Sequence, residues 1–121
     1  MVVSIKNQVV TQWNSVFQQF INELAKKYPD TGGVKNMNIK FNIGKTVSLN
    51  YPINMFTENV KEHKTEIRNK NSHYFVNEDI PFIKDLELDK IYEQTDEETK
   101  MTIWNYLIAL LDISEVYDKL K

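Results

Sequence analysis

Cysteine is absent from this chain of 121 residues, so no disulfide bond can form, and the absence fits a reducing compartment without proving one. Long apolar runs are absent too. The longest, from Tyr106 to Leu111, is far shorter than the roughly 20 residues that span a bilayer. We therefore expect a soluble protein with no membrane-spanning segment.

Reactive groups are also scarce. The only histidines are His63 and His73, no H-E-x-x-H motif is present, and a metal site usually needs three or four converging ligands. No serine lies in a Gly-x-Ser-x-Gly elbow, and the Gly32-Gly33 pair is too little for a phosphate-binding loop. The sequence therefore predicts no enzymatic activity, no cofactor and no metal.

The composition is that of a globular protein. Hydrophobic residues make up 41% of the chain and charged residues 26%, which is too apolar for a disordered tail. A chain of this length can bury most of its unfolded surface around one core. We expect residues 1–121 to form a single domain.

The two ends of the chain have the clearest helical periodicity. From about Lys6 to Tyr28, apolar residues recur every three or four positions, and Pro29 ends the pattern. Near the C-terminus, Thr95 and Glu98 resemble a capping box that starts a second long helix. We expect a break in that helix at 112–114. The two apolar stripes should pack against each other, and they include Trp13, Phe17, Phe20 and Leu24 in the first helix, and Trp104, Leu107 and Leu111 in the second.

The stretch between 34 and 51 has two interpretations. Alternation of apolar and polar residues favours a β-hairpin over about 38–51, with Gly44-Lys45 as its bend. Read with helical spacing, Ile39, Ile43 and Val47 form a stripe at i, i+4 and i+8. Periodicity alone slightly favours the hairpin, and Gly44 would also cost about 1 kcal/mol inside a helix.

Further apolar residues indicate helical structure between 50 and 92. Tyr51-Pro52 is typical of a helix start, and the pattern continues to about Lys70. A short apolar segment and an irregular or helical stretch follow. The residues expected to point inward are Ile53, Phe56, Val60, Ile67, Tyr74, Phe75, Val76, Ile83, Leu86, Leu88, Ile91 and Tyr92.

Charge is distributed unevenly. Residues 1–70 hold ten basic and five acidic residues, and residues 71–121 hold five basic and twelve acidic residues, so the halves carry +5 and −7 and the chain −2. Such asymmetry attracts one half to the other within a molecule, or one molecule to the next in a homo-oligomer. Both alternatives remain open.

Nucleic-acid binding is the alternative function. Lys61, Lys64 and Arg68 form a basic stripe that would contact phosphates. The net charge is negative, however, Arg68 is the only arginine, and glutamates interrupt the stripe. Nucleic acid is therefore not the expected partner.

One family resemblance covers most of the chain. The segment from Thr99 to Leu111, with Ile103-Trp104 followed by an aromatic residue and leucines, resembles a pattern in small uncharacterised proteins of the nucleocytoplasmic large DNA viruses, the giant viruses. The other matching residues also pack in a core: Trp13-Asn14, Val16-Phe17, Phe20, Leu24, Tyr51-Pro52-Ile53, Phe56, Val60 and Phe75-Val76. The resemblance implies a viral origin, an all-helical fold and a place in the host cytoplasm or the virion. It also favours a helix from about Lys35 to Leu49.

We therefore expect an all-α bundle of four or five helices that acts without catalysis. Its partner would be a viral or host protein, in virus assembly, replication or host manipulation. Ile103, Tyr106, Leu110 and Tyr117 are the expected interface, because they fall outside the predicted core stripe and aromatic residues are enriched at interfaces. Burial beneath a neighbouring helix is the alternative for these four residues.

Overall fold

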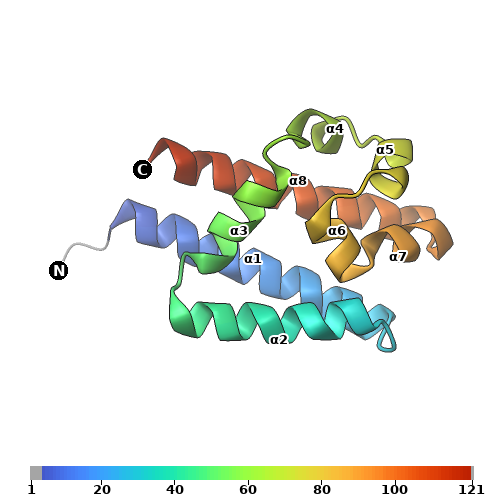
Figure 1. Cartoon of the computed structure of the whole chain (residues 1–121), viewed down its shortest axis with the longest axis horizontal. Helices are drawn as coiled ribbons and strands as arrows, with labels where there is room; N and C mark the ends of the chain where they lie inside the picture. Colours follow the sequence, from blue (N-terminus) through green and yellow to red (C-terminus); the bar gives the residue numbers. More distant parts are fainter. Residues whose placement is uncertain (1–3, 121) are drawn as a thin grey trace.

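The computed structural model describes residues 4–120, which form eight helices and no strand (Figure 1). The all-α prediction is confirmed, and the β-hairpin over 38–51 is wrong for this segment. The helices are α1 (Ile5–Lys27), α2 (Gly32–Val47), α3 (Tyr51–Val60), α4 (Lys64–Arg68), α5 (Ser72–Asn77), α6 (Pro81–Leu86), α7 (Leu88–Gln94) and α8 (Glu97–Lys119).

The predicted number of four or five helices is too low, because the chain turns repeatedly between 60 and 97. The helix expected to run to about Lys70 is broken into α3 and α4. At the break, the His63 N–H donates to the carbonyl of Val60 at 2.8 Å, and His63 leaves helical geometry with φ −121° and ψ 9°. The turn directs α4 toward α8, which it contacts. Helices of five to seven residues, such as α4 to α7, are too short for periodicity to reveal their ends.

The two longest helices, α1 and α8, lie side by side and run in opposite directions (Figure 1). Their apolar faces meet, as the sequence predicts. The rings of Phe20 and Tyr106 stack between them with centroids 4.9 Å apart. Trp13 and Trp104 are both buried, at 1% and 4% exposure. The pairing of the two helices is therefore confirmed.

Two details of α8 differ from the sequence prediction. Asp96, not Thr95, is the N-cap, and its carboxylate accepts from the Thr99 N–H at 2.7 Å. The break expected at 112–114 does not occur. Ser114 is buried there, and its hydroxyl donates to the Leu111 carbonyl at 2.7 Å, which satisfies it inside a continuous helix.

Buried side chains from all eight helices form one core cluster. Of the residues expected to point inward between 50 and 92, Tyr74 and Val76 are partly buried against the core and the others are buried. Within the core, aromatic rings form two groups. One lies beneath α2 and α3, and the other joins Phe75, Tyr92 and Trp104.

Both ends of α2 are held by polar contacts with other helices or loops. At its start, the Gly33 N–H donates to Glu87 Oε2 at 3.0 Å, between α6 and α7. Just past its end, the Leu49 carbonyl accepts from Asn14 Nδ2 of α1 at 2.9 Å. These contacts fix α2 relative to α1 and α6, and they position the groove described next.

Candidate binding groove between α2 and α3

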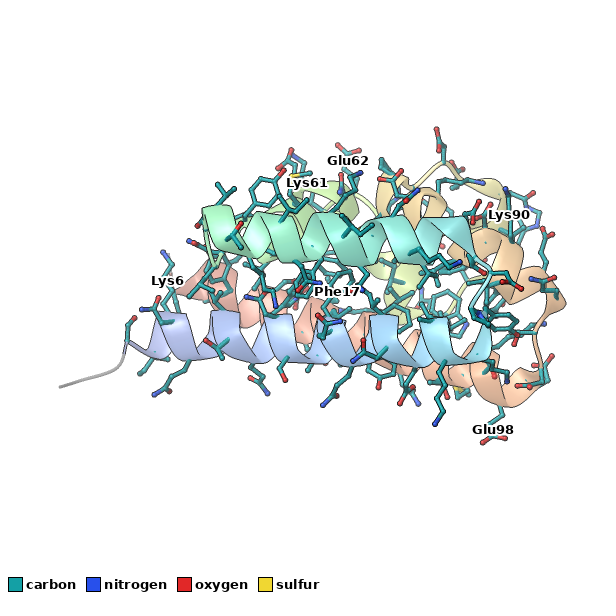
Figure 2. The ribbon with its side chains drawn as sticks, turned by 90° about the horizontal axis from the view of Figure 1, so that it is seen from below. Lys6, Phe17, Lys61, Glu62, Lys90 and Glu98 are labelled. Atoms are coloured by element: carbon teal, nitrogen blue, oxygen red, sulfur yellow. The ribbon has the colours of Figure 1, made fainter. Side chains whose placement is uncertain are left out.

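Five aromatic rings from four helices form the floor of a groove between α2, α3 and α6. Trp13 and Phe17 come from α1, and Figure 2 shows Phe17 lying between the ribbons of α1 and α2. Ring centroids of neighbouring members lie 4.8 to 5.6 Å apart. None of the five is more than 5% exposed. The floor consists of Trp13, Phe17, Phe41, Phe56 and Phe82.

The rim of the groove is apolar and exposed. Ile43 and Val47 of α2 are 60% and 76% exposed, and they face Met55 of α3 across the opening. Lys40 and Asp85 add one charge of each sign to the lining. The space between these walls has a volume of about 400 Å³, in the range of sites that hold a ligand or a partner's side chains.

An exposed apolar stripe continues from the rim along α2. Ile39, Ile43 and Val47 succeed one another at four-residue intervals, so they cover about 12 Å of one helix face. Leu49 and Tyr51 extend the stripe across the loop to α3, at 60% and 47% exposure. We call these residues, together with Met55, the α2–α3 face. A contiguous exposed apolar surface of this kind marks an interaction site more often than scattered apolar residues do.

Gly44 allows Tyr51 to approach α2 closely at this face. A Cβ atom at Gly44 would lie 2.8 Å from Tyr51 Cδ1, which is closer than real contacts allow. The glycine that argued against a helix in this segment therefore makes room for an aromatic ring beside the groove. The tertiary contact explains why a poor helix former lies inside α2.

The interface expected on α8 is wrong for three of its four residues. Ile103, Leu110 and Tyr117 are buried at 1%, 0% and 2% exposure, beneath neighbouring helices. Tyr106 is half-buried against Phe20. Burial, followed by a hydrogen bond to the Glu23 carboxylate, raises the pKa of its hydroxyl. The three buried residues of this set therefore lie beneath neighbouring helices, which is the alternative interpretation. Because α1, α3 and α4 all contact α8, more than one side of α8 is covered.

The basic stripe is offset by carboxylates. Lys61 Nζ lies 2.8 Å from Glu58 Oε1, and the Arg68 guanidinium bonds Asp112 and Glu115 at 2.8 Å each. Lys64 Nζ lies 3.8 Å from the Glu115 carboxylate. Lys61 and Glu62 also lie at the same edge of the molecule (Figure 2). These acids reduce the positive potential that phosphate binding would use.

Part of the uneven charge is matched within the molecule. Lys64 and Arg68, from the basic half, pair with Glu115 and Asp112 of α8. Lys27 of α1 pairs with Asp96 at 2.7 Å. Intramolecular attraction between the halves is therefore observed, and a homo-oligomer formed through charge stays a prediction.

A second, smaller hollow lies between α1 and the start of α8, with a volume of about 220 Å³. Its polar groups largely bond one another. Lys27 and Thr99 line the hollow, and Lys27 donates to the Thr99 hydroxyl and to Asp96. It therefore offers fewer free groups to a ligand than the groove between α2 and α3.

Among residues 4–120, no three His, Cys, Asp or Glu side chains lie close enough together to hold a metal ion. The helices that the structure describes include none with the length and apolarity to cross a membrane. No protein-family model, curated protein or solved structure matches the chain. The groove and the α2–α3 face are thus the features on which a functional argument can rest.

Sequence reasoning missed the α2–α3 face, although a signal was present. The helical interpretation of 34–51 placed apolar residues on more than one side of the helix, with Met37 and Phe41 beside the stripe of Ile39, Ile43 and Val47. One side of a helix is enough for a core. The surplus apolar side was the observable sign of an uncovered surface.

Proposed function

We propose that this chain is a protein-binding module and that a partner protein covers the α2–α3 face. The observation that carries the proposal is the stripe of Ile39, Ile43 and Val47, exposed at 58%, 60% and 76% beside a groove with an aromatic floor. Burying such side chains is worth about 25 cal/mol per Å² of apolar area. A partner that covers them gains this energy without deforming the core.

A protein fits this surface better than a small molecule does. A small ligand could fill the 400 Å³ groove but would leave Ile39 and Leu49 exposed outside it. A helix or extended segment of a partner covers both the groove and the stripe. The five packed rings beneath are buried and mutually supported, so the floor keeps its shape on binding.

The experiment is photo-crosslinking in cells that make the protein, with a photoreactive phenylalanine analogue in place of Ile43. We expect crosslinks to one or a few proteins. Val116 is the matched control site, because it is 48% exposed, apolar and located on α8. Equal crosslinking yields from both sites would contradict the proposal.

A second variant makes the test independent of the crosslinker. We expect the partner identified by crosslinking to co-purify with the original protein and with Val116→Asp, and not with Ile43→Asp. Neither substitution removes a buried side chain, so both variants should keep the unfolding free energy within about 0.5 kcal/mol of the original protein. Full recovery with Ile43→Asp would move the interface elsewhere.

The biological setting that we propose is viral, in assembly, replication or host manipulation. Its support is the resemblance of 99–111 and of the other quoted residues to giant-virus proteins. The protein would then occur in the host cytoplasm or in the virion. Mass spectrometry of purified virions and of fractionated infected cells tests this setting, and absence of the protein from both would exclude it.

A further inference from the structure

The α2–α3 face has an unusual local charge. Between Thr31 and Thr57 the only charged residues are Lys35, Lys40 and Lys45, and no acidic residue occurs. This segment contributes +3 to a net charge of −2, so the rest of the chain carries −5. The exposed apolar surface therefore lies in a positively charged part of an acidic protein.

These three lysines differ in their surroundings from the cations that form ion pairs, and within the described part of the chain they share the lack of a carboxylate partner with Lys6, Lys26, Lys70 and Lys119. Lys27, Lys61 and Arg68 each lie within 2.8 Å of a carboxylate oxygen. No carboxylate among residues 4–120 lies within ion-pair distance of Lys35, Lys40 or Lys45. A charge without an intramolecular counterpart can attract one on a partner.

The lysines flank the apolar stripe on both sides. At 100° per residue, Lys40 lies on the groove side of Ile39 and Ile43, and it lines the groove. Lys35 lies on the opposite flank, about 40° from Ile39, and Lys45 lies farther round α2, where its ammonium group is 4.6 Å from the centre of the Phe41 ring. A partner whose apolar side enters the groove would therefore present both of its polar flanks to lysines.

A second copy of this chain fits the face poorly. In a two-fold symmetric contact the same surface meets itself, so the lysines of both copies would be brought together. Like charges at a contact oppose association. The groove itself contains one acid, Asp85 on the α6 side, opposite Lys40. Asp85 repels a partner's acidic groups only at the α6 side of the groove.

We propose that the partner segment is an acidic amphipathic helix. Its apolar side chains enter the groove and cover Ile43 and Val47, and its carboxylates lie against Lys40 on one flank and Lys35 on the other. Helix-in-groove binding reads apolar anchors at i, i+3, i+4 and i+7, which match an uncovered stripe of about two turns. This inference rests on the proposed function, and it adds the secondary structure and charge of the partner.

The test uses two designed peptides of about 18 residues, roughly five helical turns. Both carry leucine and phenylalanine at i, i+3, i+4 and i+7. One has glutamate at the other positions and its twin has lysine. Fluorescence anisotropy of each labelled peptide is measured against the whole protein at low salt. We expect the acidic peptide to bind at least about tenfold more tightly than the basic one, with affinity that falls as salt rises.

Charge reversal then tests the lysines directly. We expect the triple variant Lys35→Glu, Lys40→Glu, Lys45→Glu to reverse the preference, so that the basic peptide binds more tightly. The matched control is Lys26→Glu, Lys70→Glu, Lys119→Glu, which changes the net charge equally at three exposed lysines elsewhere. It should keep the preference for the acidic peptide.

The outcomes separate the two proposals. Equal binding of both peptides, lost in Ile43→Asp, overturns the charge inference and leaves the groove as a protein-binding site. Peptide binding that Ile43→Asp does not change overturns the groove itself. Binding to phosphatidylserine vesicles without binding to the acidic peptide, or a dimer in sedimentation that Ile43→Asp dissociates, assigns the face to a membrane or a second copy and refutes the inference.

Discussion

Gly33 lies where the start of α2 meets the junction of α6 and α7, and an added methyl group has no room there. A Cβ atom at Gly33 would lie 2.6 Å from the backbone oxygen of Asp85 and 2.8 Å from the backbone carbon of Leu86. Both neighbours are main-chain atoms of a packed turn, so neither can rotate away. We therefore expect Gly33→Ala to push α2 away from α6.

The expected cost can be worked out from three contributions. Overpacking at a rigid contact costs about 1–3 kcal/mol. Displacing Gly33 from Glu87 weakens a hydrogen bond worth about 1 kcal/mol. Alanine's greater helix propensity offsets about 1 kcal/mol. The unfolding free energy should fall by about 2 kcal/mol.

Gly32→Ala is the matched control, because no heavy atom lies within 4 Å of a Cβ atom built at Gly32. This variant should keep or slightly raise the unfolding free energy, by at most about 1 kcal/mol. The assay is urea denaturation followed by far-UV circular dichroism. If Gly33→Ala is as stable as Gly32→Ala, the close packing of α2 against α6 is refuted.

Three further predictions concern polar contacts and backbone strain. Tyr92→Phe should lower the unfolding free energy by about 1–3 kcal/mol, because the buried Trp104 Nε1–H loses its acceptor at 3.0 Å; urea denaturation should show this, and an unchanged midpoint would exclude the bond as a stabilising contact. Lys70→Gly should raise the unfolding free energy by about 0.5–1 kcal/mol, because Lys70 has φ 53°, a left-handed conformation that is unfavourable for every residue except glycine. A decrease of the unfolding free energy in urea denaturation would contradict this. The Lys27 hydrogen bond, and then the Thr99 N–H, hold the pKa of Asp96 well below its ordinary value, so the charge of Asp96 stabilises the fold above about pH 4 and this contribution is lost as the pH falls through the lowered pKa. Asp96→Asn keeps a helix cap but removes the charge, so its melting temperature should fall less at acid pH than that of the original protein. Equal falls of the melting temperature with pH in both proteins would show that the charge of Asp96 does not stabilise the fold.

Long, strongly periodic segments could be predicted from the sequence. The apolar spacing around Trp13 and Trp104 identified the two helices and their pairing, because each helix has to bury a stripe against a partner. Local chemistry was less reliable. Two residues beside each other, Thr95 and Asp96, could both cap α8, and only the course of the chain selected Asp96.

The short helices could not be predicted, for a physical reason. A helix such as α4 has five residues, fewer than two turns, so one buried residue, Ile67, is its whole apolar pattern. The positions of such helices depend on distant contacts, among them the bonds from Arg68 to Asp112 and Glu115 of α8. Contacts between residues more than 40 positions apart leave no periodic trace in the sequence.

The middle of the chain shows why an apolar stripe alone does not identify the core. α2 buries Val34 and Phe41 on one side and exposes Ile39, Ile43 and Val47 on the other. At the sequence level the exposed stripe has the better spacing, and it would be assigned to the core by periodicity alone. Because one side already meets α1, α3 and α6, the second side adds nothing to the stability of the isolated fold. Three large exposed apolar residues on one helix promote non-specific association and lower the solubility of the protein. A partner that covers these residues removes both effects.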